Sequence, residues 1–321
     1  MRRPVVVATD FSPSALEALR YARRFARGAP LHLFHAFDWS DSKAAQAVAT
    51  ELERAGGERG AAIERLLRRE AQAAEMGEGA CVLAHGVASS PDTVATHAGR
   101  VAASVLAYAE RVGAGAVAVG RHGRGSRLLP LPPRWLGSVA LAVVRGGSTD
   151  ALVVPPQKDA PWFALPTRRV VAAVDEQATA QALVARAEGV AEAAGAALDL
   201  LHVVGVQESA WNHLGDPEGP EGAERRLRAA LASLVTPGAR AGVHLRHGDP
   251  AGEIAAWVSE HGGDLVVMAS HRPDAVDRVL VGSVAERVIA RASCPVWVLR
   301  AAPEIQPPSA VAGGASEQGR R

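Results

Sequence analysis

Residues 4–10 read PVVVATD, and residues 169–175 repeat the pattern as RVVAAVD. Each stretch is a short apolar run that ends in an aspartate, which is typical of a buried parallel strand that reaches the edge of a sheet. Each is followed by an alanine-rich helical segment, 13–27 or 178–194, with a glycine close to its end, where helices commonly stop. The chain therefore starts the same strand–helix unit twice.

The repeat continues along both halves. LHLFHAF (31–37) matches LDLLHVV (198–204) position for position, with His35 and His202 in the same place. The other predicted elements follow in the same order: charged helices at about 43–75 and 221–235, third strands at DTVATHAG (92–99) and AGVHLRHG (241–248), fourth strands at GAGAVAVG (113–120) and GGDLVVMA (262–269), and last strands at ALVVPP (151–156) and PVWVLR (295–300). Each half thus reads β-α-β-α-β-α-β-α-β.

This order predicts the fold class. Alternating strands and helices imply right-handed crossovers and an open five-stranded parallel sheet, with helices on both faces, in each half. Proline cannot continue a strand or a helix, so the proline-rich segment between the halves reads as a linker. We expect a first domain at 1–156, a linker at 157–167, a second domain at 168–301 and a disordered tail at 302–321.

The two halves differ in length. The first half has 16 more residues between its first aspartate and its third-strand glycine, and we place most of them around 76–91. The segment ACVLAHGV within this insertion is compatible with an extra strand or with a packed loop. Beyond it we expect a register without gaps, because Gly99 to Gly120 and Gly248 to Ala269 both span 21 residues.

Composition excludes several classes of protein. A chain of 321 residues with 48% hydrophobic residues and a net charge of +1 reads as a soluble globular protein, with no electrostatic reason to bind nucleic acid. The N-terminus does not read as a signal peptide, and no apolar run approaches the roughly 20 residues that span a bilayer. The two cysteines, Cys81 and Cys294, form no CxxC pair, which fits a reducing compartment. We expect a cytoplasmic protein without a membrane partner.

Four segments resemble the universal stress protein family in its tandem two-domain form: ATDFSPSA (8–15), HGDPAGEI (247–254), DLVVMASHRP (264–273) and LVGSVAERVIARASCPVWVL (280–299). The resemblance covers 4–155 and 168–300. It implies a Rossmann-like fold, related to that of adenine nucleotide alpha-hydrolases, and packing of the two domains as an internal pseudo-dimer through their last strands. Two such chains could then form a homodimer. In one branch of the family it implies binding of ATP or another adenine nucleotide.

The resemblance also implies a binding motif, G-x2-G-x9-G-[ST], with an aspartate after the first strand. In open α/β sheets ligands bind beyond the carboxyl ends of the strands, where glycines let backbone amides approach phosphates and a helix N-terminus supplies further donors. The first half keeps both early glycines but has 13 residues, not nine, before Gly137. A longer loop can bulge outward with its ends in place, or it can pull them apart. The candidate residues there are Asp10, Gly120, His122, Gly123, Gly137 and Ser138.

The second half keeps the nine-residue spacing but replaces the two early glycines with Ala269 and Arg272. The arginine could fill the site or pair with a phosphate. Because a misplaced Cβ blocks contact directly, we weigh the glycines above the spacing and favour the first half as the nucleotide site. The candidate residues of the second half are Asp175, Ser270, His271, Gly282 and Ser283.

Other polar residues have ordinary alternatives. Asp10 and Asp175 can cap the next turn instead of contacting a ligand. Histidine pairs at 32/35 and 244/247 have metal-like spacing, but residues i and i+3 of a strand face opposite sides, so we expect no metal site. The loop arginines at 121, 124 and 127 can steer an anion or be merely solvated. Cys294 reads as a small buried residue, and Cys81 as a thiol that could be reactive.

The sequence contains no GxxxxGK[ST], no GxSxG, and no GxGxxG after the first strand, so it carries no signature of rapid hydrolysis and no catalytic residue is assigned. We expect a stress-response regulator that binds an adenine nucleotide, with Mg²⁺ only as a companion of that nucleotide. Two alternatives stay open. One is a scaffold for unknown protein partners with no nucleotide, and the other is a slow ATPase.

Overall fold

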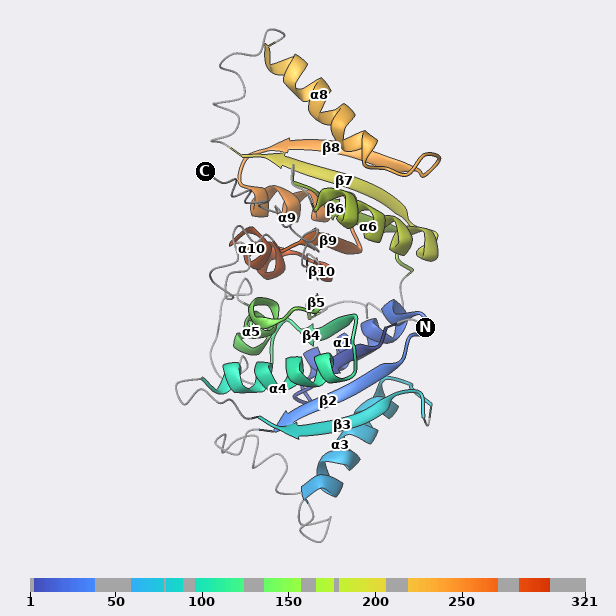
Figure 1. Cartoon of the computed structure of the whole chain (residues 1–321), viewed down its shortest axis with the longest axis vertical. Coiled ribbons are helices and arrows are strands. Elements are labelled where there is room, and N and C mark those ends of the chain that lie inside the picture. The colour runs from blue at the N-terminus through green and yellow to red at the C-terminus, as the bar shows by residue number, and fades with distance from the viewer. Residues whose placement is uncertain are drawn as a thin grey trace, which may run out of the picture.

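The computed structural model describes residues 3–37, 59–77, 79–88, 96–123, 136–156, 166–175, 179–205, 219–270 and 283–300. These residues form one ten-stranded sheet with helices on both faces (Figure 1). The strand order is β3-β2-β1-β4-β5-β10-β9-β6-β7-β8, so each half contributes five neighbouring strands. Within each half all pairings are parallel, which confirms the predicted α/β class.

Local sequence signals set the helix ends of the first half. Ser12 caps the first helix by accepting a hydrogen bond from the amide of Ala15, and Thr96 does the same for Gly99. Pro13 takes the first helical position, where its missing N–H costs nothing. The elements are β1 (Val5–Ala8), α1 (Pro13–Ala26), β2 (Leu31–Phe37), α3 (Arg59–Ala73), β3 (Val82–Val87), α4 (His97–Arg111), β4 (Ala116–Gly120), α5 (Ser138–Gly146) and β5 (Asp150–Val154).

The second half repeats this order. Asp249 caps a helix that starts at Pro250, and Gly195 ends an earlier helix in the left-handed conformation, at φ 62°. The elements are β6 (Arg169–Ala173), α6 (Ala180–Ala194), β7 (Ala197–Val204), α8 (Gly219–Ser233), β8 (Ala241–His247), α9 (Pro250–His261), β9 (Leu265–Ala269), α10 (Ser283–Arg291) and β10 (Val296–Leu299).

Two apolar layers lie on the two faces of the sheet, and both extend across the two halves. One layer packs α1, α3, α6 and α8 onto the sheet, and in it Leu19 and Leu183 belong to the same cluster. The other packs α4, α5, α9 and α10, and joins Val105 to Ile289. The halves therefore share their hydrophobic cores.

The halves meet through β5 and β10 at the middle of the sheet (Figure 1). These two strands pair antiparallel, with Leu152 opposite Trp297, so the predicted packing through the last strands is confirmed. A bidentate ion pair joins the neighbouring helices, with Arg145 of α5 donating to both carboxylate oxygens of Glu286 in α10 at 2.7 and 2.8 Å. Asp150 is buried at the same junction and accepts from Arg186 at 2.6 Å.

The third strand of the first half lies elsewhere than predicted. It is β3, at Val82–Val87, inside the segment that we had interpreted as an insertion, and it pairs with β2. The predicted strand at 92–99 is wrong, because His97 already begins α4. The real surplus lies partly in the connection from β3 to α4, where nine residues (88–96) stand against two (248–249) in the second half.

The expected register without gaps is also wrong. Gly99 matches Gly252 and not Gly248, since each donates its amide to the residue that caps α4 or α9, Thr96 or Asp249. Helix α4 has 15 residues and α9 has 12, and the loop that follows adds one more in the first half. The first half therefore contains about one additional helical turn between its third and fourth strands.

The two cysteines differ in accessibility, which predicts their reactivity. Cys294 is buried, and burial raises the pKa of its thiol to about 12, whereas Cys81 is half-buried with a pKa raised by the same cause. Because the thiolate is the reactive form, we expect about one thiol per native chain to react slowly with an aromatic disulfide reagent at pH 8, and two after unfolding in guanidinium. Rapid reaction of both thiols in the native protein would contradict the burial of Cys294.

Candidate functional site

The candidate residues of the first half gather where the order of strands reverses. β1 lies between β2 and β4 and is parallel to both, so the chain turns outward on either side of it. Asp10 follows β1, and Gly120 is the last residue of β4. In a sheet of this kind the crevice at the carboxyl edge of such a switch point is the usual place for a ligand.

Gly120 allows α1 to pack directly against the end of β4. A Cβ atom at this position would lie 2.7 Å from the backbone carbon and oxygen of Ser14 in α1. Real Cβ atoms do not approach a backbone so closely, so only glycine fits here without a shift of the helix. This contact fixes the start of α1 relative to the candidate loop.

Gly123 allows the loop backbone to reach the carboxylate of Asp10. A Cβ atom at Gly123 would lie 2.6 Å from Oδ2 of that side chain. The other carboxylate oxygen, Oδ1, accepts a hydrogen bond of 3.0 Å from the amide of Ser12. Asp10 therefore holds the β1–α1 turn and also faces the glycine loop, and its contact with a ligand stays a prediction.

The two ends of the long loop lie together. The amide of Gly137 donates to the carbonyl of Arg121 at 2.8 Å. A Cβ atom at Gly137 would lie 2.9 Å from that same oxygen and 3.4 Å from Cα of His122. The surplus residues therefore leave Gly123 and Gly137 side by side at the neck of the loop. Ser138 opens α5 directly after this neck, and the N-cap residue, Gly137, makes no side-chain hydrogen bond to the helix.

A buried network that we did not predict supports the turn after β1. The Thr9 hydroxyl donates to Glu70 of α3 at 2.6 Å, and the Thr9 carbonyl is bonded to Nδ1 of His35 at 2.8 Å. Phe11 adopts a left-handed conformation, with φ at 58°, and its ring lies 4.6 Å from the His35 ring. The signal was the histidine repeated in both halves: His202 forms the same 2.8 Å bond to the carbonyl that follows β6.

The second half presents a different arrangement. Ser270 is buried, and its hydroxyl accepts from Arg300 at 3.3 Å. Asp175 follows β6, and Ser283 opens α10. α6 begins five residues after Asp175, whereas α1 begins three residues after Asp10, and this later start accompanies Ala269 in the place of Gly120. The predictions for His271, Arg272 and Gly282 lie outside the described residues, as do those for Arg124 and Arg127.

Comparison with known proteins identifies this architecture. The model of the universal stress protein family matches the chain twice, at residues 1–155 and 166–300, so that each match covers one five-stranded half. The chain belongs to the universal stress protein family. It is a tandem member, with one family domain in each half, and it shares the general assignment of the family to stress responses.

Relatives agree with this assignment. A universal stress protein from Methanocaldococcus jannaschii is 33% identical over 93 residues, which cover 29% of this chain and about half, 54%, of the relative. One from Thermus aquaticus is 34% identical over 130 residues, 39% of this chain and 91% of the relative. A crystal structure of a universal stress protein from Archaeoglobus fulgidus shares the fold along 94% of this chain and 99% of its own, with 18% identity and a TM-score of 0.60.

Within the first universal stress protein domain, Arg121 has neither of the two roles that we considered. Its side chain leaves the loop and enters the second half, where Nη1 donates to the carbonyl of Ala292 at 2.8 Å. The carbonyls of Ile289 and Ala290 lie farther away, at 3.3 and 3.4 Å. Arg121 therefore neither steers an anion nor lies in a solvated loop, because it binds the C-terminal end of α10.

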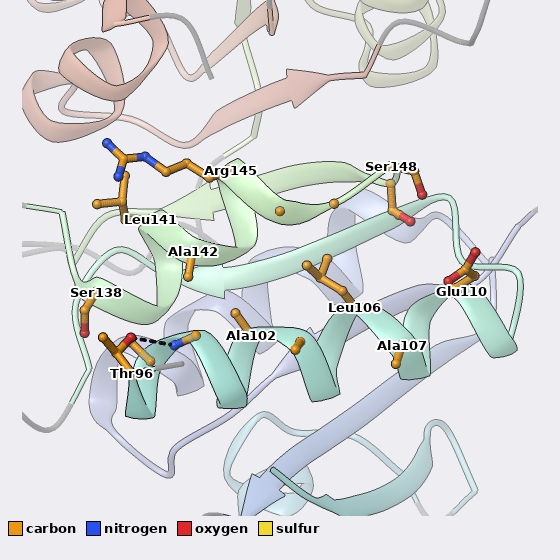
Figure 2. A pocket seen from close by; sticks show the side chains of 16 residues that line it. Thr96, Ala102, Leu106, Ala107, Glu110, Ser138, Leu141, Ala142, Arg145 and Ser148 are labelled. Carbon is orange, nitrogen blue, oxygen red and sulfur yellow. Dashed lines mark hydrogen bonds between the residues drawn. The ribbon is translucent and has the colours of Figure 1, made fainter. Parts of the chain in front are cut away.

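A groove of about 690 Å³ runs between α4 and α5 of the same domain. Figure 2 shows Thr96 and Ser138 at one end and Glu110 and Ser148 at the other, with small and apolar side chains and Arg145 between them. Among the candidate nucleotide-site residues that the structure describes, only Ser138 lines this groove. The groove therefore lies beside the glycine loop and is lined by a different set of residues.

The second universal stress protein domain explains why the groove is open. There, Asp249 at the start of α9 binds Arg287 and Arg291 of α10, at 2.7 and 2.9 Å. α5 and α10 both have nine residues, so the first domain has Ala142 and Gly146 in place of those arginines and Thr96 in place of the aspartate. The first domain therefore lacks the three charged side chains that bridge α9 and α10 in the second domain.

Two searches over the described residues gave negative results. No group of three or more His, Cys, Asp or Glu side chains is placed to hold a metal ion. The histidine pairs contact opposite faces, as expected, since His244 meets Asp199 and Trp257 of α9 while His247 meets Glu224 of α8. No helix among these residues is long and apolar enough to cross a membrane.

Proposed function

We propose that the first domain binds an adenine nucleotide, with ATP as the first ligand to test, and that the protein acts as a nucleotide-dependent regulator in a stress response. The observation that carries the proposal is the closed neck of the loop, the 2.8 Å bond from Gly137 to Arg121, which keeps both ends of the motif at the Asp10 edge despite the surplus residues. Backbone amides without Cβ obstruction are what a phosphate chain needs.

The start of α5 supports the same proposal. Ser138 is exposed at the first position of the helix, and the N-cap residue, Gly137, has no side chain with which to cap the first amides. The first amides of a helix lack intrahelical acceptors, and the helix dipole is positive at this end, so both favour phosphate oxygens. Mg²⁺ would enter only with the nucleotide. Solved universal stress proteins that match one half of this chain include complexes with dAMP and with cAMP, which are ligands of those proteins.

The test is equilibrium binding of labelled ATP to the full chain and to Gly123→Arg. Because any side chain at 123 collides with the Asp10 carboxylate, we expect affinity to fall at least about thirtyfold, equivalent to about 2 kcal/mol. The matched control is Gly189→Arg in α6, where the same charge enters open space, and affinity should be unchanged.

Three outcomes separate this proposal from the alternatives. Absence of ATP binding by the unmodified chain would overturn it and favour the scaffold. Binding of ATP without turnover supports the regulator. Steady phosphate release that disappears in Gly123→Arg, but not in Gly189→Arg, would instead favour the slow ATPase. Pairing of two chains and a cytoplasmic location stay predictions from the sequence.

A further inference from the structure

Arg121 lies between Gly120 and Gly123 of the candidate loop, yet its side chain contacts the second half. Its guanidinium donates to the Ala292 carbonyl at 2.8 Å and approaches the carbonyls of the preceding helical turn. The last four carbonyls of a helix lack intrahelical partners, and a cation there also interacts favourably with the helix dipole. Arg121 thus supplies the C-terminal cap of α10.

The surroundings of this contact make it a costly one to break. Arg121 is half-buried, and this burial lowers the pKa of the guanidinium. A half-buried charged donor that loses its acceptors loses more than a solvated one, because water replaces them less readily. The position of the α10 terminus and the position of the Arg121 backbone are therefore tied together.

The backbone of Arg121 is at the same time the structural centre of the loop neck. Its amide donates to the carbonyl of Val154, at the end of β5, at 2.8 Å. Its carbonyl accepts from Gly137, directly before α5, also at 2.8 Å. One residue therefore joins the end of the junction strand, the start of α5 and the last turn of a helix in the other half.

We propose that Arg121 is a positioning residue through which the second domain holds the glycine loop of the first domain in its ligand-binding geometry. The inference rests on the proposed nucleotide site and adds a role for the second domain in it. Loss of the α10 contact frees the Arg121 backbone, and with it the hydrogen bond that closes the neck. By linkage, a nucleotide in the first domain must then stabilise the last turn of α10 in the second.

The experiment measures two quantities on the full chain: ATP affinity, and hydrogen exchange of the α10–β10 segment with and without ATP. Arg121→Met keeps the length and apolar stem of the side chain but removes its donors. Energetic couplings between sites commonly amount to a factor of five or more, so we expect Arg121→Met to weaken ATP binding at least about fivefold. We also expect it to abolish the slowing of exchange in α10 that ATP causes in the unmodified protein.

The matched control is Arg145→Met, which removes another arginine that reaches α10 from the first half, through Glu286, and that has no bond to the loop neck among the described residues. The ATP affinity of Arg145→Met should stay within about twofold of that of the unmodified chain, a difference of about 0.4 kcal/mol in binding free energy. Arg121→Lys keeps a cation at the helix terminus and should restore part of both the affinity and the exchange effect.

The outcomes distinguish this inference from the proposed function. If the unmodified chain binds no ATP, both fall. If it binds ATP and Arg121→Met binds equally well, only the positioning role is wrong. Equal losses in Arg121→Met and Arg145→Met would show general loosening of the junction and would also overturn it. Should Arg121→Met fail to fold, Arg121→Lys decides, because ATP affinity equal to that of the unmodified chain without any exchange response in α10 contradicts the role.

Discussion

Trp297→Ala should lower the free energy of unfolding by about 4 kcal/mol, the range measured when large buried aromatic side chains are truncated. The indole lies under the junction of the two halves and is 4% exposed. Phe25 of α1 meets its ring edge-on with centroids 5.0 Å apart, and the guanidinium of Arg186 of α6 lies 4.7 Å from it. One side chain from each half therefore packs against the same ring, and truncation removes both contacts at once.

The measurement is chemical denaturation monitored with two probes, each of which reports the unfolding of one half. Trp257→Ala is the control, because this tryptophan is equally buried but packs within the second half, against the rings of His244 and His261. Both variants should lose similar stability, but only Trp297→Ala should separate the unfolding transitions of the halves. Trp297→Phe should recover most of the loss, since the indole Nε1 has no hydrogen-bond partner among the described residues. Coincident transitions in Trp297→Ala would refute a shared core centred on this ring.

Gly120→Ala should destabilise the chain by about 3 kcal/mol, near the upper end for overpacking of a well-packed site. The added methyl group lies 2.7 Å from backbone atoms of Ser14, and backbone cannot move aside as a flexible side chain can. The start of α1 must shift, and the turn that holds Asp10 must shift with it. Thermal and chemical unfolding of the variant measure the effect.

Two variants serve as controls, one that introduces alanine at an unconfined glycine and one that introduces glycine at the position equivalent to Gly120. Gly77→Ala places a methyl group in open space outside any helix or strand, and we expect a change within about 0.5 kcal/mol. Ala269→Gly makes the reverse substitution at the equivalent position, the end of β9. There α6 starts later than α1 does, so the close contact that requires glycine at 120 does not arise. It should cost about 1 kcal/mol through lost packing and added flexibility. A Gly120→Ala loss no larger than these would contradict the close contact with α1.

Much of the fold followed from the repeat in the sequence, and the error at β3 has a physical cause. Central strands such as β1 and β4 are buried on both faces, so their runs of valine and alanine are unmistakable. β3 is an edge strand whose Val82 and Val87 are exposed, and its pattern is correspondingly weak. The equal spacing from Gly99 to Gly120 and from Gly248 to Ala269 was a coincidence. Gly99 and Gly248 are not equivalent positions, and α4 is longer than α9.

The candidate site could be predicted only in part. The grouping of Asp10, Gly120, Gly123 and Gly137 was expected from the binding motif that the family resemblance implies. Whether the surplus loop residues separate the glycines depends on one bond, from Gly137 to Arg121, that no spacing rule contains. The direction of the Arg121 side chain depends on the end of α10, as its bond to Ala292, 171 residues away, shows. Local composition left two interpretations of Arg121, anion steering and a solvated loop, because it contains no information about a partner so distant in the chain.

The antiparallel pairing of β5 with β10 has a consequence for how the molecule responds to dilution. When two separate chains pair through such strands, mass action governs the assembly, and the pair dissociates as the concentration falls. Here both strands belong to one polypeptide, so the effective concentration of each for the other is set by the connecting segment and does not change on dilution. The two unlike halves accordingly stay matched one to one at any cellular abundance of the protein, and neither can exchange its partner for a copy of itself without first breaking the sheet.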